Sequence, residues 1–279
     1  MVNQTVTVHK PMSEEVIVSI DGKVIEITLN RPPANAITRD VSFAIYEALK
    51  TLQDDDSLQC GIITGTGDKI FCAGWDLKEF ANMDSNEEAL ADSLECPGGF
   101  AGITEFWDLK KPVICAANGI TVGGGFEIAL ACDIVMCAEH AEFFLPEMQR
   151  GFLPDVGGIQ QLPRKFPYNV AMELLLTGRR MPAEEAKHWG FVSEVLPAER
   201  LIERARETAH LVASGAPLPL QALKEVVPAI QELPIREAFA ATKPGNDNFP
   251  VYQKMLFSED FMEGGRAFAE KRLPVWKGK

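Results

Sequence analysis

The sequence contains neither a paired-cysteine motif nor a long apolar run. Its six cysteines are scattered without a Cys-x-x-Cys pair, and several lie in apolar, strand-like segments, which favours buried free thiols in a reducing compartment. No stretch of 18 or more apolar residues is present, and the first residues lack the basic and apolar regions of a secretory signal. We therefore expect a cytoplasmic protein that does not insert into a membrane.

Basic residues are in short supply. The chain has 27 lysines and arginines against 40 aspartates and glutamates, a formal net charge of −13, and no Lys/Arg-rich run. A field of this sign repels the phosphates of nucleic acids and anionic membrane surfaces. Neither is expected as a partner.

Several catalytic signatures are also missing. The Gly-x-Ser-x-Gly motif of serine hydrolases does not occur, and the four histidines are too far apart to have metal-ligand spacing. The glycine run 123–125 does not fit a dinucleotide-binding fingerprint, because Ile128 stands where glycine or alanine is needed. We expect no metal and no prosthetic group.

What is present indicates an α/β protein. Hydrophobic residues make up 46% and charged residues 24% of 279, the balance of a globular chain. Strand patterns alternate with helix patterns, and repeated strand–helix–strand units predict a mainly parallel sheet covered by helices. The expected strands are 15–20, 23–29, 60–64, 111–117, 134–137 and 142–145, and the expected helices include 41–53, a polar helix in the 80s and 90s, and an apolar helix from 124 to about 132.

The C-terminal part is predicted to be mostly helical from about Tyr168 onward. Helical spacing is found at 172–176, 183–189, 201–213 and 220–230. We therefore divide the chain into an N-terminal extension (1–14), an α/β core (15–198) and a helical C-terminal region (199–279).

Two glutamates and a glycine run stand out from their surroundings. Gly124 lies in a run before an apolar helix, where unpaired N–H groups and glycine's small size suit an oxyanion, although a tight turn would also explain the run. Glu127 sits in the first turn of that helix among apolar neighbours, where a carboxylate is costly to bury. Glu147 follows the proline that ends an apolar strand. Each glutamate alone also has a sufficient structural role.

Several segments together resemble the crotonase (enoyl-CoA hydratase/isomerase) superfamily, over nearly the whole chain after residue 14. They are the Asn-Arg-Pro turn with Ala-Asn-Ala at 30–36, CAGWDLK at 72–78, KPV at 111–113 before Asn-Gly at 118–119, GGGFE at 123–127, LPE at 145–147, and GFLPDVGG at 151–158. Glu147 lies 20 residues after Glu127, which is similar to the hydratase members. The resemblance implies a spiral of ββα units with a helical C-terminal region that forms trimers, often paired as hexamers.

The resemblance also implies roles for residues. Trp75 and Gly124 match the two positions whose N–H groups bind a thioester carbonyl, and Glu127 and Glu147 match the acid/base pair of hydratases. Removing a proton α to a thioester places negative charge on the carbonyl oxygen, so two amides and two carboxyls form a consistent set. The same resemblance implies that Glu147 acts mainly at C2 and that Glu127 holds the water. Coenzyme A, as part of the substrate, is expected along Ala34, Ala36, Ala73, Asp76, Leu77 and Lys78, with Asp76 also a candidate helix N-cap.

Within the superfamily, AGWDLK, PGGFAG at 97–102, GGGFE and the final AFAEKRLPVWKGK are most similar to the members that dehydrate carnitinyl-CoA to crotonobetainyl-CoA. A quaternary ammonium group cannot donate hydrogen bonds and favours aromatic faces. Trp75, Phe100, Trp107 and Phe126 are candidates for such an acyl pocket, and ordinary core or lid packing explains them equally well.

Two other functions are compatible with the same pattern. Asp155 lies eight residues after Glu147, where double-bond isomerases resembling this family place an aspartate, although a loop acid is the simpler interpretation. A non-catalytic scaffold that binds CoA, RNA or a partner protein is the second alternative. The acidic balance counts against RNA, and the intact glutamate pair counts against an inactive site.

Overall fold

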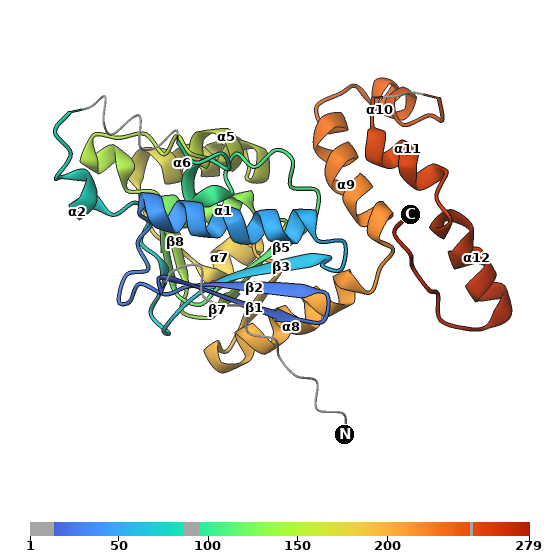
Figure 1. Ribbon diagram of the computed structural model, residues 1–279. Helices are drawn as coiled ribbons and strands as arrows, with labels where there is room; N and C mark the ends of the chain where they lie inside the picture. Colours follow the sequence, from blue (N-terminus) through green and yellow to red (C-terminus); the bar gives the residue numbers. More distant parts are fainter. Residues whose placement is uncertain (1–13, 86–94, 246–247) are drawn as a thin grey trace.

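The computed structural model describes residues 14–85, 95–245 and 248–279 and contains two sheets (Figure 1). The larger has the strand order β1-β2-β3-β5-β7-β10 and the smaller β4-β6-β8-β9. Their strands are β1 (Val16–Asp21), β2 (Val24–Leu29), β3 (Cys60–Gly65), β4 (Ile70–Cys72), β5 (Val113–Ala117), β6 (Ile120–Val122), β7 (Ile134–Ala138), β8 (Glu142–Phe144), β9 (Met181–Pro182) and β10 (Glu194–Leu196).

The helices follow the strands along the chain. They are α1 (Arg39–Asp54), α2 (Leu77–Phe80), α4 (Gly124–Ala131), α5 (Gly158–Lys165), α6 (Tyr168–Thr177), α7 (Ala183–His188), α8 (Ala198–Ala213), α9 (Pro217–Ile230), α10 (Ile235–Ala241), α11 (Pro250–Leu256) and α12 (Asp260–Glu270). Two 3₁₀ turns, η1 (Phe100–Gly102) and η2 (Glu147–Arg150), lie at the ends of loops. The predicted polar helix in the 80s and 90s falls partly on residues 86–94, outside the described residues.

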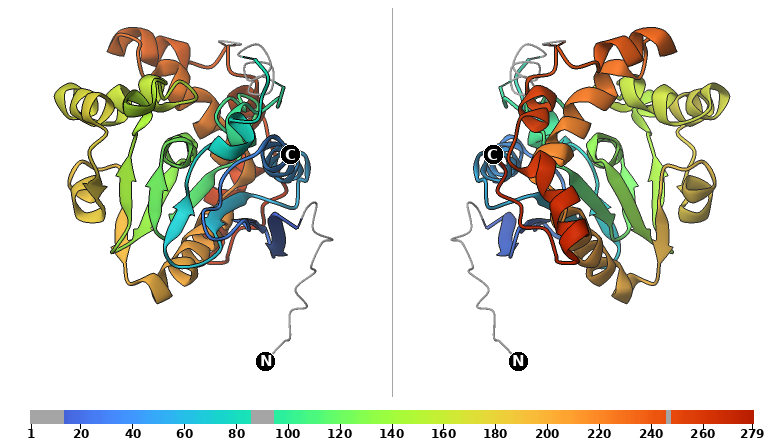
Figure 2. Two further views of the ribbon diagram at one scale, coloured as in Figure 1. Left: turned by 90° about the vertical axis from the view of Figure 1, so that its left-hand side faces the viewer. Right: turned by 90° about the vertical axis from the view of Figure 1, so that its right-hand side faces the viewer.

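The central strands of the larger sheet, β3 and β5, are buried on both faces. β1 and β2 form the expected antiparallel hairpin, and β2, β3, β5, β7 and β10 pair in parallel. Because side chains alternate along a strand, Ile25 and Ile27 pack in the cluster that includes α1, whereas Val24 and Ile62 pack with α8. Figures 1 and 2 show α1 and α8 on opposite sides of these strands. The predicted α/β fold, a spiral of strands and helices, is confirmed.

All six cysteines are free and buried, as expected from their apolar contexts. Burial raises the pKa of the Cys60, Cys72 and Cys137 thiols to about 12, so they remain protonated at neutral pH. Within the described residues, no helix is long and apolar enough to cross a membrane.

The C-terminal helices extend away from the sheets. Figure 1 shows α9, α10, α11 and α12 beside the core rather than on it. A division at residue 199 falls at the start of α8, yet Leu201, Ala205 and Ala209 of that helix are buried against the sheet. The helices that leave the sheet therefore begin at α9. Residues 1–13 of the predicted N-terminal extension lie outside the described part of the chain.

Candidate active site

Glu127 is buried in the first turn of α4 and is held by the next helix in the fold. Its side chain is 2% exposed, and its Oε1 accepts a 2.8 Å hydrogen bond from the Gly158 N–H, at the start of α5. Burial raises the pKa of Glu127 to about 8, and the nearby carboxylates Glu147 and Asp155 act in the same direction. At neutral pH this carboxyl group therefore carries a proton that it can donate.

Glu147 begins the 3₁₀ turn η2, directly after the proline that ends the strand segment. Its Oε1 lies against the backbone of Gly123. A Cβ atom placed on Gly123 would be only 2.5 Å from this oxygen. Its Oε2 is buried and accepts no hydrogen bond from the described residues. Burial raises the pKa of Glu147 as well. A buried carboxylate oxygen without a partner is costly unless a ligand or water supplies one.

Asp155 completes a group of three acids. It is exposed, its backbone carbonyl accepts from Gln160 Nε2 at 2.7 Å, and its charge raises the pKa of both Glu127 and Glu147. Asp155 therefore raises the pKa of the two glutamates through its negative charge, from an exposed position.

The backbone N–H groups of Trp75 and Gly124 are the two donors that the family resemblance assigns to a thioester oxygen. Residue 75 forms a parallel bridge with Ile37, in which Ile37 N–H donates to the Gly74 carbonyl at 2.8 Å and Asp76 N–H donates to the Ile37 carbonyl at 2.9 Å. In this arrangement the N–H of Trp75 points away from Ile37. Within the described residues, neither the Trp75 N–H nor the Gly124 N–H donates a hydrogen bond to the protein.

Close contact between two backbone segments explains the glycines here. A side chain at Gly74, whose φ is +79°, would begin 2.7 Å from the Gly124 nitrogen. A side chain at Gly124 would begin 2.5 Å from the Phe100 ring. The glycines therefore let the backbone at Gly74, next to Trp75, lie directly against the Gly124 nitrogen.

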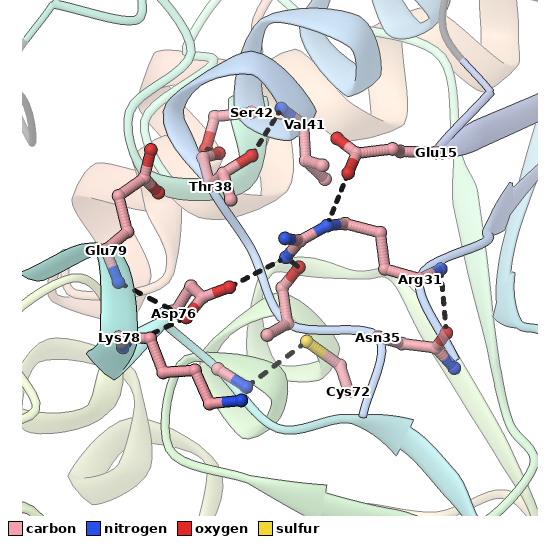
Figure 3. A network of polar contacts seen from close by, with 12 residues as sticks. Glu15, Arg31, Asn35, Thr38, Val41, Ser42, Cys72, Asp76, Lys78 and Glu79 are labelled. Carbon is pink, nitrogen blue, oxygen red and sulfur yellow. Dashed lines mark hydrogen bonds and ion pairs between the residues drawn. The ribbon is translucent and has the colours of Figure 1, made fainter. Parts of the chain in front are cut away.

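The segment expected to contact coenzyme A lies beside these amides. Ala73 N–H donates to the Ala34 carbonyl at 3.0 Å, which joins the two parts of the segment. Asp76 caps α2 by accepting from the N–H groups of Lys78 and Glu79, at 3.0 and 3.4 Å, as the N-cap hypothesis predicted (Figure 3). Leu77 and Lys78 are exposed and Ala36 is partly exposed.

The aromatic residues separate into core and site groups. Phe126 is fully buried and packs against Phe143 and Phe191 at centroid distances of 5.4 and 5.3 Å, as the core-packing alternative for this residue describes. Trp107 is 72% exposed and lines neither of two cavities found among the described residues. Phe100, by contrast, lies against Gly124, as described above.

Sequence reasoning missed two aromatic residues of the site. The ring of Phe80 contacts Trp75 edge to face at 5.0 Å, and Phe152 contacts Phe80 at 5.3 Å. Phe152 is also linked to the backbone of Glu147, because its N–H donates to the Glu147 backbone carbonyl at 3.0 Å. A row of three rings therefore leads from Trp75 to the 3₁₀ turn that begins at Glu147. The sequence signal that could have pointed to Phe80 and Phe152 is an aromatic residue in a short segment with polar neighbours.

Trp75 and Phe100 also line a small cavity together. Its other walls include Thr38, Ser42 and Cys96, and its volume is about 20 Å³. This is room for a single water molecule, so an acyl group cannot enter without movement of the walls.

The site combines two acids with two free amides. The amides can stabilise a negative oxygen, one carboxyl can accept a carbon-bound proton and the other can exchange a proton with water. Within the described residues, no cluster of His, Cys, Asp and Glu could hold a metal ion.

Comparison with known proteins agrees with this geometry. The family model "Enoyl-CoA hydratase/isomerase" matches residues 19–279. The chain is 48% identical over 268 residues to carnitinyl-CoA dehydratase of Salmonella typhi, covering 96% of this chain and 100% of that protein. The chain belongs to the enoyl-CoA hydratase/isomerase family.

Solved structures of this family have the same fold. Enoyl-CoA hydratase from Mycobacterium tuberculosis H37Rv is 34% identical, with a TM-score of 0.85 and coverage of 96% of this chain and 100% of that one. The Bacillus anthracis enoyl-CoA hydratase is also 34% identical, with a TM-score of 0.86 and coverage of 95% and 100%. As a member of the enoyl-CoA hydratase/isomerase family with these relatives, the chain is a hydro-lyase of the enoyl-CoA hydratase and carnitinyl-CoA dehydratase type.

Proposed function

We propose that this hydro-lyase reversibly hydrates a short-chain enoyl-CoA thioester, with carnitinyl-CoA and crotonobetainyl-CoA as its substrate pair. The observation that carries the proposal is the buried, unpaired Oε2 of half-buried Glu147, together with two amides that donate to no described residue. The acyl group is taken from the relatives, since carnitinyl-CoA dehydratases are 48% identical over 268 residues.

In the dehydration direction, the thioester oxygen accepts from the Trp75 and Gly124 N–H groups. Glu147 removes the proton at C2, and the charge moves to that oxygen, where each donor contributes about 3 kcal/mol. Glu127 then gives its proton to the hydroxyl at C3 as the C–O bond breaks, and water leaves. Hydration follows the same steps in reverse. Coenzyme A lies along Ala34, Ala36, Ala73, Asp76, Leu77 and Lys78.

The isomerase alternative has less support. An isomerase would use Asp155 as the second acid, but Asp155 is exposed. Glu127 is instead the buried carboxyl with a pKa of about 8 and a fixed partner in Gly158. The geometry therefore favours addition and removal of water over migration of a double bond.

An assay panel tests the substrate. Hydration of crotonyl-, longer enoyl- and crotonobetainyl-CoA is followed by loss of the enoyl absorbance. We expect the highest kcat/KM for crotonobetainyl-CoA, because the row Trp75, Phe80 and Phe152 offers ring faces to a quaternary cation. Phe80→Leu and Phe152→Leu are expected to lower kcat/KM for crotonobetainyl-CoA by ~5- to 30-fold more than for crotonyl-CoA.

A matched aromatic variant serves as the control for this test. Phe106 pairs with Tyr46 at 5.0 Å, outside the row of three rings. Phe106→Leu is expected to leave the ratio between the two substrates unchanged. An equal loss for both substrates in Phe80→Leu and Phe152→Leu would exclude the aromatic row as the selector of the cation.

The C-terminal helices form the contact between copies in a homotrimer or a hexamer. Phe257, Phe268 and Leu273 are 84%, 87% and 86% exposed, which is unusual for large apolar side chains. Light scattering is expected to give a trimer or hexamer mass. Phe257→Asp with Phe268→Asp is expected to reduce that mass, and a monomeric wild-type protein at micromolar concentration would contradict the assignment.

A further inference from the structure

A continuous chain of hydrogen bonds connects a cation to the oxyanion amide. Arg31 Nη1 donates to the Ala36 carbonyl at 2.8 Å. That carbonyl belongs to the same peptide group as the Ile37 N–H, which donates to the Gly74 carbonyl at 2.8 Å. The Gly74 carbonyl in turn belongs to the same peptide group as the Trp75 N–H. The guanidinium is therefore two peptide groups away from the proposed thioester oxygen.

A chain of hydrogen bonds of this kind strengthens the N–H donor at its end. A hydrogen bond to a peptide carbonyl withdraws electron density and makes the N–H of that peptide a better donor, so successive bonds strengthen one another. The direction matters: every bond runs from Arg31 toward Trp75. The Trp75 N–H is the last donor, and it has no acceptor among the described residues.

Arg31 is itself held in place from both sides (Figure 3). Its Nε donates to Glu15 Oε1 at 2.7 Å, and its Nη1 also lies 3.1 Å from Asp76 Oδ2. Burial alone would raise the pKa of Asp76, but the hydrogen bond from Arg31 and those from the Lys78 and Glu79 amides hold that pKa below its usual value. Arg31 therefore stands beside an ionised carboxylate.

Asp76 ties the same arginine to the backbone on the far side of Trp75. Its N–H donates to the Ile37 carbonyl at 2.9 Å, and its side chain caps α2. Arg31 thus contacts the residue before Ile37 and the residue after Trp75, which fixes the two segments relative to each other. The Asn35 side chain anchors the turn between them, accepting from Arg31 N–H at 3.1 Å and donating to the Thr66 and Ile70 carbonyls at 3.0 and 2.9 Å.

We propose that Arg31 is a positioning residue that orients and polarises the Trp75 N–H through the Ala36–Ile37 and Gly74–Trp75 peptide groups. This inference rests on the proposed function, because it assigns the Trp75 N–H to a thioester oxygen. It makes a charged side chain outside the reacting atoms a contributor to the stability of the enolate.

The test measures carbonyl polarisation separately from turnover. Butyryl-CoA labelled with ¹³C at the thioester carbonyl has no double bond to hydrate, and infrared difference spectra report its carbonyl stretch when bound. In the wild-type protein the band is expected to lie below its position in solution. Arg31→Gln is expected to lose more than half of this shift, and Arg31→Lys, which keeps the charge, is expected to be intermediate.

Kinetics supply the second readout. Arg31→Gln is expected to lower kcat for crotonyl-CoA hydration ~10-fold and to change the Kd of butyryl-CoA less than ~3-fold, because the donor weakens but remains present. Arg206→Gln is the matched control, since Arg206 makes a two-bond ion pair with Glu26 at 2.7 and 2.8 Å, away from the site. It is expected to match the wild type in both measurements.

The outcomes separate this inference from the proposed function. A full infrared shift in folded Arg31→Gln overturns the inference, whatever happens to activity. If Arg31→Gln does not fold, an unchanged shift in Arg31→Lys overturns it instead, because a lysine cannot keep the forked contact with both acceptors. A wild-type protein that shifts the carbonyl band but hydrates no enoyl-CoA would overturn the proposed function and leave the polarising role of Arg31 intact.

Discussion

Replacing Glu147 by glutamine is expected to reduce kcat for hydration ~10³-fold, because the amide cannot take or give the proton at C2. The same variant is expected to stop the exchange of the C2 protons of butyryl-CoA with D₂O, which NMR measures without any hydration step. Glutamine fills the same space beside Gly123, so the fold is expected to persist.

A surface glutamate provides the control for this variant. Glu142 pairs with Arg180 at the surface, and Glu142→Gln is expected to keep both hydration and exchange. Exchange at the wild-type rate in Glu147→Gln would exclude Glu147 as the group that acts at C2.

Glu127→Gln is expected to separate the two halves of the reaction. Hydration is expected to fall ~10³-fold because no carboxyl remains to exchange a proton with water, while C2 exchange of butyryl-CoA stays within ~10-fold of the wild type. Undiminished hydration in this variant would exclude the proposed mechanism. An equal loss of exchange would show that the two glutamates do not have separate roles.

The raised pKa of Glu127 also sets a pH limit. In the wild type, kcat/KM for dehydration is expected to fall as pH rises through about 8, where Glu127 loses the proton it must donate. Hydration must fall in parallel, since the overall equilibrium takes up no net proton.

Stability depends on pH through the same group. Because the folded-state pKa lies above the ordinary glutamate pKa of 4.5, the contribution of the protonated carboxyl is complete below about 4.5 and is lost as pH rises through about 8. Glu127→Gln removes this loss, which amounts to roughly 5 kcal/mol at pH 9. Calorimetry at one protein concentration is expected to give a higher Tm for the variant at pH 9 and similar values near pH 5.

The sequence was most informative where a residue contradicted its surroundings. Glu127 in an apolar helix and Glu147 after a strand-ending proline stood out in this way, although their joint role came only from the family resemblance. In the structure Glu127 is buried and Glu147 lies against Gly123. The long strands and helices were also predictable, because their hydrophobic periodicity is repeated several times.

Contacts between distant segments were not predictable in the same way. Phe80 and Phe152 meet only because the end of α2 lies against the segment after η2, and Phe126 looked similar to them in sequence but packs in the core. The strands β6, β9 and β10 have three residues or fewer, too short to show a period. Arg31 was visible only as part of a turn motif, since its partner Asp76 lies 45 residues away.

The parallel pairing of β2, β3, β5 and β7 has a consequence for folding. Such pairing joins segments far apart in the chain, and Arg31, Trp75, Glu127 and Gly158 reach one site from separate segments. Chain closure over these distances is slow, and the strands must be in register before the acids and amides meet. Recovery of catalysis after dilution from denaturant would therefore trail the recovery of helical circular dichroism, and enzyme activity is the more demanding criterion of complete refolding.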